Sequence, residues 1–363
     1  MGTLETQTHW EPTFGKLNGL DVVSSYGDPT EEWRAFAETA GVIDISSRGR
    51  LCFVGQDRHR FLHGQLTNEV AGLQPGEGCF AGLVSAKGKL EMEVHVFCLE
   101  DEILVDFEPG YFDAVRRRFE AYVIGDDVEI VDASPFYGMA GVHGPRSEAV
   151  LKGMGLGLEL PAKDHGIVTA NDPVLGLIYV TNNPRLGVQG FDVLAPVGVI
   201  PELLERLRRA AAEFGGRACG FDAWENKRVE AGIPRYGVDM DATNLAPETG
   251  LERRGISYSK GCYIGQEIIA RIRTYGQVAK ALRVLEFSGS AAGLPARGDA
   301  LWTSDRKEVG YVTSVIRSLA DARITGLGYV RKEFNEVGRE IFWKGPTGEF
   351  AVKIKGLPYS SAP

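Results

Sequence analysis

The first helix of the chain is predicted by apolar residues that recur at helical spacing. Asp28 supplies a side chain suited to capping, and Pro29 suits the first helical position. The apolar positions that follow are separated by three, one and three residues: Trp33, Phe36, Ala37 and Ala40. This spacing places them on one face, so we expect a short amphipathic helix that ends at Gly41.

Strands and helices then alternate without a simple repeat. Residues 51–54 read as a strand and 58–66 as a helix, and the same order returns at 139–142 and 147–152, which hints at a duplicated subdomain. Other strands are predicted at 83–97, 103–107 and 191–195, and other helices after Gly110 and from Pro201 to Gly215.

The pattern changes after about residue 280. Apolar and polar residues alternate at 281–287, 310–315, 325–330, 341–343 and 350–354. Several short strands with little helix predict a small C-terminal β-barrel.

A further helix is predicted to begin near Cys262. The residues that would share one of its faces are Ile264, Ile268, Ile269 and Ile272. A helix start and the ammonium of Lys260 would both favour an ionised Cys262 sulfur. The alternative is a buried cysteine that acts as a small hydrophobe on a packed helix.

Length and charge narrow the class of protein. A chain of 363 residues is longer than a single core usually reaches, so two or three domains are expected. The net charge of −9 argues against broad binding to nucleic acid or to anionic membranes, although a local basic pocket remains open. No apolar stretch is long enough for a transmembrane helix, and the first residues lack the features of a signal peptide.

The cysteines and histidines do not form a metal motif. Five cysteines and six histidines are scattered, with no C-x-x-C and no H-E-x-x-H. An odd number of dispersed cysteines suits free thiols in a reducing compartment, so we expect a cytoplasmic protein with no bound metal.

One stretch carries a specific resemblance. Residues 260–267 read K-G-C-Y-I-G-Q-E, which resembles the signature of the YgfZ family, folate-binding relatives of the T-protein (aminomethyltransferase) of the glycine cleavage system. The resemblance continues, in the family's order, through residues 41–47, 54–57, 66–70, 190–193 and 228–232, and so covers most of the chain. It implies a multi-domain aminomethyltransferase-like fold with a C-terminal β-barrel. We therefore expect an N-terminal α+β subdomain at 1–135, a second at 136–279 with the folate-pocket and K-G-C motifs, and the barrel at 280–363.

The resemblance also implies a pocket for tetrahydrofolate or a derivative. This ligand joins a flat pterin, whose edge presents adjacent N–H donors, to an anionic glutamate tail, so a carboxylate acceptor is needed at the pterin. The matching acid is Asp192, whose alternative role is a hydrogen bond to a local turn. Arg228 matches a family arginine of the pocket, but Arg228 and Glu230 could instead pair as a structural salt bridge. Tyr236, like Trp224, could stack on the ligand or belong to the core. The segment 232–237 reads as a loop suited to lining a pocket.

One position departs from the T-protein pattern. The first acid of the T-protein's acidic pair falls on Met92, with Glu93 in the second place. Strand alternation puts Glu91, Glu93 and His95 on one face and Met92 on the other. A methionine cannot transfer a proton, and we expect Glu93 to replace the missing acid only if the strand is shifted by one residue.

Two functions follow from the resemblance, with a third kept open. The first is a tetrahydrofolate-binding protein that supports assembly or repair of iron-sulfur clusters in other enzymes, including tRNA-modifying ones, with Cys262 as functional thiol aided by Lys260. The second is a folate-dependent one-carbon transferase of the T-protein type, with Glu93 as its acid. A scaffold that does not use folate is the third. For the first of these functions we expect a monomer whose partners are folate and iron-sulfur enzymes or assembly proteins, with no direct contact to nucleic acid or membrane.

Overall fold

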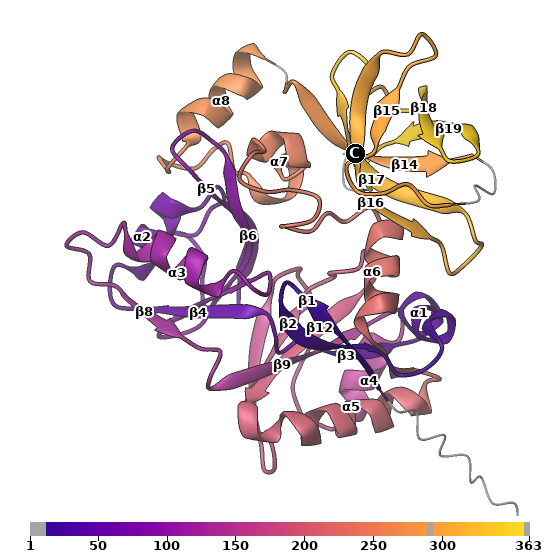
Figure 1. The fold of residues 1–363 in the computed structure, drawn as a ribbon. Coiled ribbons are helices and arrows are strands. Elements are labelled where there is room, and N and C mark those ends of the chain that lie inside the picture. Colours follow the sequence, from indigo (N-terminus) through magenta and orange to yellow (C-terminus); the bar gives the residue numbers. More distant parts are fainter. Residues whose placement is uncertain (1–11, 277, 289–292, 359–363) are drawn as a thin grey trace, which may run out of the picture.

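The structure is a computed structural model that describes residues 12–276, 278–288 and 293–358. Its strands form two open sheets of five and six strands, a closed barrel of six strands and a small hairpin. Helices cover the open sheets, while the barrel lies at the upper right of Figure 1, in orange and yellow. The α+β fold with a C-terminal barrel is therefore confirmed.

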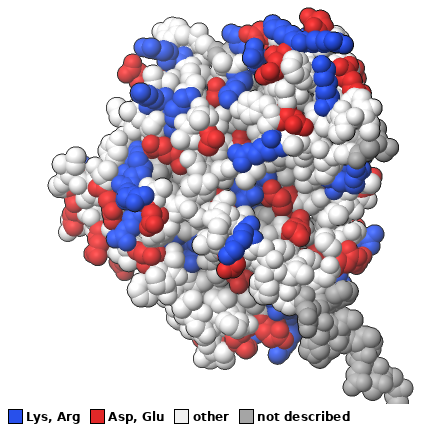
Figure 2. All heavy atoms as spheres, in the orientation of Figure 1, with Lys and Arg blue, Asp and Glu red and all other residues white. Residues whose placement is uncertain are grey.

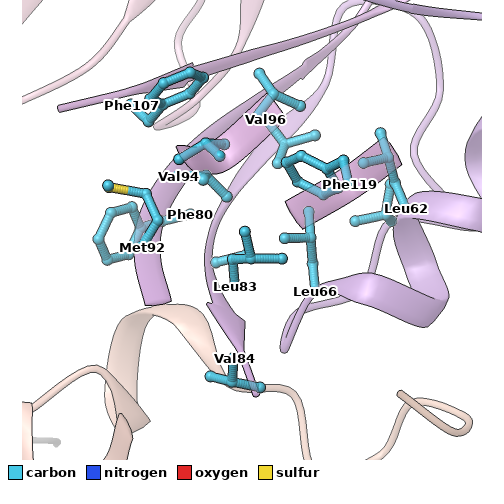
Figure 3. Packing of buried hydrophobic residues seen from close by; sticks show 14 of the residues in the cluster. Leu62, Leu66, Phe80, Leu83, Val84, Met92, Val94, Val96, Phe107 and Phe119 are labelled. Atoms are coloured by element: carbon cyan, nitrogen blue, oxygen red, sulfur yellow. The ribbon is translucent and has the colours of Figure 1, made fainter. Parts of the chain in front are cut away.

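The five-stranded sheet comes from the first part of the chain and has the order β5-β6-β7-β4-β8. Its strands are β4 (Gly49–Val54), β5 (Gly78–Val84), β6 (Leu90–Cys98), β7 (Ile103–Phe107) and β8 (Glu129–Asp132). Helices α2 (Arg58–Gln65) and α3 (Phe112–Glu120) accompany it. Leu62 of α2, Val94 of β6 and Phe119 of α3 share one buried cluster, so the helices and the sheet have a common core (Figure 3). The predicted single strand at 83–97 is wrong, because a turn over residues 85–89 divides it into β5 and β6.

The six-stranded sheet has the order β10-β11-β12-β9-β3-β13. Its strands are β3 (Gly41–Asp44), β9 (Tyr137–His143), β10 (Ile167–Asp172), β11 (Gly176–Asn182), β12 (Gly190–Pro196) and β13 (Arg217–Ala218). Helices α1 (Pro29–Glu38), α4 (Ser147–Gly153), α5 (Ile200–Glu213) and α6 (Phe221–Glu230) contact it or one another. The cap predicted for α1 is confirmed, because Asp28 accepts a hydrogen bond from the amide of Thr30 at 2.8 Å.

Strand β3 ties the beginning of the chain to this second sheet, because it pairs with β9 from Gly41 opposite His143 to Asp44 opposite Ala140. The remaining N-terminal strands, β1 (Thr13–Leu17) and β2 (Leu20–Ser25), form the hairpin. The division of the chain at residues 135 and 279 stays a prediction.

The C-terminal barrel closes in the order β14-β17-β16-β15-β18-β19. Its strands are β14 (Lys280–Phe287), β15 (Ala300–Trp302), β16 (Glu308–Arg317), β17 (Ile324–Arg331), β18 (Glu340–Gly345) and β19 (Gly348–Lys355). Five of them coincide with predicted alternating segments. Strand β15 was not predicted because its length of three residues is too short to show a period of two.

The segment between α6 and the barrel holds short elements that adjoin the first sheet. A 3-10 turn at Ala246–Thr249 precedes α7 (Glu252–Gly255), and α8 (Gln266–Tyr275) follows. Another 3-10 turn, Val197–Val199, leads into α5. The helix predicted to begin near Cys262 begins at Gln266 instead, because Gly265 takes the left-handed conformation with φ of 83°. Across the described ranges, no helix combines the length and hydropathy needed to span a bilayer.

Candidate functional site

A central cavity lies where the first sheet, α6, α7 and the loop after α6 meet. It contains about 490 Å³ of space, and this volume includes space open to solvent. Its lining is rich in arginine, with two carboxylates and two aromatic rings: Arg48, Phe80, Glu93, His95, Glu108, Arg185, Trp224, Arg228, Ile233, Pro234, Arg235 and Arg254. The predicted pocket-lining loop therefore does line a cavity, through residues 233–235.

Asp192 is held in the wall behind this cavity. It is fully buried on β12, and its Oδ2 accepts a hydrogen bond from Nε of Arg185 at 2.9 Å. His143 Nε2 lies 3.4 Å from its other oxygen. Burial alone would raise the pKa of Asp192, but the charge of Arg185 and the nearby His143 lower this pKa to about 2. Asp192 is thus an ionised partner of Arg185, and Arg185 is the group that reaches the cavity.

Arg185 joins Asp192 to a second ionic pair. Its Nη2 lies 2.6 Å from Oδ2 of Asp106, which also accepts from Arg48 at 2.8 Å. Arg48 in turn lies 3.1 Å from Glu108. Buried charges in a continuous network of this kind are fixed in position, since the loss of any partner leaves an uncompensated charge. The two arginines are therefore rigid parts of the cavity wall.

Arg228 also lines the cavity, but its guanidinium is occupied by protein groups. It contacts Asp239 at 2.6 Å, Ser314 of the barrel at 3.0 Å and Glu225 in a short ion pair. The salt bridge considered between Arg228 and Glu230 does not form. Both lie on helix α6, where residues two apart point in different directions.

Glu230 and Tyr236 do not line the central cavity. Glu230 accepts hydrogen bonds from Trp33 Nε1 at 3.0 Å and Ser318 Oγ at 2.9 Å, and it borders a different hollow between α6 and the barrel. Tyr236 is buried, and its ring packs edge-on against Tyr111 with centroids 5.1 Å apart. Its backbone hydrogen-bonds Glu93, so Tyr236 supports the cavity from behind.

Glu93 and His95 face the cavity from β6, whereas Met92 is part of the buried core (Figure 3). No shift of the strand is needed to bring Glu93 there, because the residue already belongs to the cavity face. Glu91 departs from that face: the register shifts at this end of the strand pair, and Glu91 accepts a hydrogen bond from Arg118 of α3 at 2.6 Å. Burial, with a contribution from Glu108, raises the pKa of Glu93 to about 8.

Several cavity residues have no signal in the sequence. Arg48, Arg185 and Arg254 lie in three distant parts of the chain and belong to no motif quoted above. His95 is backed by His165, with ring nitrogens 3.1 Å apart, and His165 adopts a left-handed conformation with φ of 61°. Only the charge of the arginines could have drawn attention to them, and most arginines of this chain lie on the surface.

The motif at residues 260–267 docks on the end of α2 rather than on the cavity. The Lys260 ammonium donates to the backbone carbonyls of His63, Leu66 and Asn68 at 2.6, 2.7 and 2.8 Å. Burial lowers the pKa of Lys260 to about 8. These bonds satisfy carbonyls at a helix C-terminus, where a cation also complements the macrodipole.

Cys262 is exposed and precedes α8 by four residues. The alternative of a buried structural cysteine is therefore wrong. So is its placement at a helix start, since Gly265 is the residue that caps α8. The Lys260 ammonium is directed to the carbonyls of α2 and its following turn, so its role beside the sulfur has no support in this geometry. Within the described part of the chain, no three metal-binding side chains gather closely enough to hold an ion.

Comparison with known proteins identifies the family of this chain. The model of the GCVT N-terminal domain matches residues 4–255, and the chain belongs to that family. An aminomethyltransferase T of the glycine cleavage system from Bartonella henselae has the same fold, with a TM-score of 0.85 at 19% identity over 96% of this chain and 94% of that one.

Relatives in the family carry different names. The tRNA-modifying protein YgfZ of Yersinia enterocolitica is 26% identical over 88% of this chain and 92% of its own length. A chloroplastic protein of Arabidopsis thaliana, to which transferase activity is ascribed, is 28% identical over 90% of this chain and 73% of its own length. Aminomethyltransferases of several bacteria also match over most of the chain. The relation to YgfZ expected from the sequence is thus confirmed.

Proposed function

We propose that this protein binds tetrahydrofolate or a derivative in the central cavity. In this proposal it supports assembly or repair of iron-sulfur clusters in other enzymes, including tRNA-modifying ones. The observation that carries the folate assignment is the convergence of Glu93, Arg185 and Trp224 on one cavity. The cluster role rests on the kinship with YgfZ, which spans nearly the whole length of both chains.

The residues at the cavity fit the chemistry of a reduced folate. Glu93 offers a carboxylate that can accept from the adjacent N–H groups of a pterin edge. Trp224 and Phe80 contribute aromatic rings to the lining, and the Arg254 guanidinium lies over the Phe80 ring, 4.7 Å from its centroid. Arg235 and Arg254 bring positive charge to the lining, suited to the carboxylates of the glutamate tail, although Arg235 also lies 3.3 Å from Glu108 and 3.4 Å from Glu225. Glu93 replaces Asp192 as the residue proposed to meet the pterin, and Asp192 acts by orienting Arg185.

Proton release accompanies binding in this proposal. Glu93 has a pKa of about 8 in the free protein, so it is mostly protonated at neutral pH. Only the ionised carboxylate accepts two N–H bonds, so the pterin must bind the minority form. Affinity for tetrahydrofolate is therefore expected to rise with pH between about 6 and 8.

Calorimetric titration with tetrahydrofolate tests the assignment. We expect wild type to bind with release of a proton, seen as a binding enthalpy that depends on the buffer. Glu93→Gln should weaken binding by about tenfold or more and remove the proton release, since charge-assisted hydrogen bonds contribute about 1.5–3 kcal/mol. Glu286→Gln, at the hollow beside the barrel, should bind as wild type does. Equal affinity of Glu93→Gln and Glu286→Gln for tetrahydrofolate would mean that Glu93 does not bind the pterin.

The cluster role has a separate test in cells. A deletion strain should lose activity of enzymes that contain iron-sulfur clusters, and wild-type protein should restore it. Cys262→Ala should fail to restore it while still binding tetrahydrofolate, because the exposed sulfur lies outside the cavity. Full restoration by Cys262→Ala would remove the thiol from the mechanism.

A folate-dependent one-carbon transferase of the T-protein type is the second candidate. The observation that favours it is again Glu93, a cavity carboxyl whose raised pKa allows it to exchange a proton near neutral pH. Purified protein should then transfer the one-carbon unit of an aminomethyl donor to tetrahydrofolate, with release of ammonia. Loss of that transfer in Glu93→Gln, with folding intact, would favour this candidate. Absence of transfer by wild type would exclude it for the donor used.

A further inference from the structure

A second hollow, the seam cleft, lies between the barrel and the segment that holds α7 and α8. In Figure 1 this segment faces the barrel at the top of the molecule. The cleft contains about 1150 Å³ of space, part of it open to solvent. Its cations come from α7, α8, β14 and the residue after β17: Arg253, Arg273, Arg283 and Lys332. The seam cleft thus collects positive charge from four separate elements.

The two acids of the seam cleft are already engaged by other groups. Glu248 accepts a hydrogen bond from the amide of Leu245 at 3.0 Å. Glu252 accepts one from the hydroxyl of Tyr258 at 2.6 Å. Neither forms an ion pair with a cation of the cleft. The acids keep their charge, so the lining holds four cations against two carboxylates.

The excess of positive over negative charge in the seam cleft is clearest at Arg283. Its side chain is half-buried, and its guanidinium donates only to backbone carbonyls, those of Asn335 and Leu282, each at 3.0 Å. Within the described ranges, no carboxylate lies within ion-pair distance of Arg253, Arg283 or Lys332. Over the face drawn in Figure 2, blue and red side chains are interspersed. A partly desolvated cation without a counter-charge is stabilised when an anion binds.

We propose that the seam cleft binds an extended oligoanion, a ligand with at least two phosphate or carboxylate groups. Because the cations come from four elements, a ligand with several charged groups can contact more of them than a single small anion can. The net charge of −9 over the whole chain makes a chance accumulation of unpaired cations at one seam less favourable.

The position of α7 suggests where such a ligand could come from. Arg254 of this single turn lines the central cavity, and the preceding residue, Arg253, lines the seam cleft. The two hollows therefore share a wall. The glutamate tail of a folate bound in the central cavity is one source of the oligoanion, and this source rests on the proposed function. A free polyphosphate is the other, and it does not.

The test uses inorganic tripolyphosphate and two variants of equal charge. The cleft variant is R253Q/R283Q/K332Q, and the matched control is R34Q/K152Q/R209Q, whose residues are exposed helix positions in ion pairs and do not line the cleft. Wild type and control should bind tripolyphosphate saturably at low salt, and the cleft variant should bind about tenfold or more weakly. Equal binding by the two variants, or no binding by wild type, overturns the proposal.

Arg283 contributes to local packing, so its substitution affects the fold as well as the charge. A second variant therefore leaves Arg283 unchanged. R253E/K332E changes two exposed side chains only and should lose binding to a similar extent while unfolding at the wild-type temperature. Retained binding in this folded variant would also overturn the proposal.

Two folates distinguish the sources. If the tail is the oligoanion, tetrahydrofolate with five glutamates should bind more tightly than the form with one, and R253E/K332E should abolish the difference. If both forms bind equally while tripolyphosphate still binds the cleft, the ligand is a separate oligoanion. If neither folate binds but tripolyphosphate does, the proposed function fails and the seam cleft stands.

Discussion

The central cavity and the motif at residues 260–267 differ in how their charged groups are used. In the cavity, charged side chains from distant segments pair with one another around an open space, and Glu93 is left with a raised pKa. In the motif, the Lys260 ammonium donates its hydrogen bonds to three backbone carbonyls, and the sulfur of Cys262 is exposed. The stretch that is most distinctive in sequence is thus fixed to the end of α2, carries one exposed thiol and does not line the central cavity.

The largest predicted effect concerns Arg185. Arg185→Met removes the cation shared by Asp106 and Asp192 and leaves two buried carboxylates short of a partner. We expect a loss of about 3–5 kcal/mol in the free energy of unfolding, measured by urea denaturation. Arg209→Met, at an exposed ion pair on α5, should change it by less than about 0.5 kcal/mol.

A double variant checks the reason for this loss. Adding Asp192→Asn to Arg185→Met removes one of the stranded charges and should recover part of the lost stability. If the double variant is less stable than Arg185→Met, the carboxylate of Asp192 is stabilised by something other than Arg185, and the network described for the cavity wall is wrong.

Lys260 carries the next largest effect. Lys260→Met keeps the length of the side chain but leaves the carbonyls of His63, Leu66 and Asn68 without their donor. We expect a loss of about 2–3 kcal/mol in the free energy of unfolding. Lys163→Met, at an exposed position, serves as the control and should have little effect. A loss no greater than that of the control would mean that the motif is not held by Lys260.

The fold could be predicted further from the sequence than the site could. Alternating segments after residue 280 predicted the barrel, and Asp28 with Pro29 predicted the start of α1, because both depend on local patterns. The break between β5 and β6 was missed, although Gly88 takes a left-handed φ of 68° in that turn. The surrounding residues are apolar enough to read as one strand, and period alone does not locate a turn.

The cavity could be predicted only in part, because its residues meet through tertiary structure. From the sequence, Glu93 is expected to replace the missing acid only if the strand is shifted by one residue. The reason is that the family's first acid falls on Met92, which strand alternation places on the opposite face from Glu93. Asp192 was assigned to the ligand from its motif, whereas its burial beside Arg185 depends on a loop that carries no pattern. The sequence allows a salt bridge between Arg228 and Glu230, but both lie on helix α6, where residues two apart point in different directions. Side-chain pairing at this level is not encoded in local periodicity.

The dependence of stability on pH is the third prediction. The pKa of Glu93 is about 8 in the folded protein and about 4.3 in an unfolded chain. Between these values the folded state binds more protons, so stability contributed by this group falls as pH rises from about 5 to 8. The stability of Glu93→Gln should therefore gain about 1–3 kcal/mol relative to wild type over that range. Parallel pH profiles for the two proteins would mean that Glu93 has an ordinary pKa.

The smallest effect on stability is expected at Cys262, where the difference between the two regions is clearest. Cys262→Ala should change the free energy of unfolding by less than about 0.5 kcal/mol, because the side chain is exposed. In the folded wild type, a charged disulfide reagent should modify one thiol quickly. Burial protects Cys52, Cys98 and Cys219 from the reagent. Cys79 is half-buried, and its burial raises the pKa of this thiol to about 12. The fast phase should vanish in Cys262→Ala, whereas tetrahydrofolate affinity should not change, since the sulfur is no part of the cavity lining. A fast phase that persists in Cys262→Ala would show that the accessible thiol belongs to another cysteine. A loss of tetrahydrofolate affinity in this variant would show that the motif contributes to the folate site.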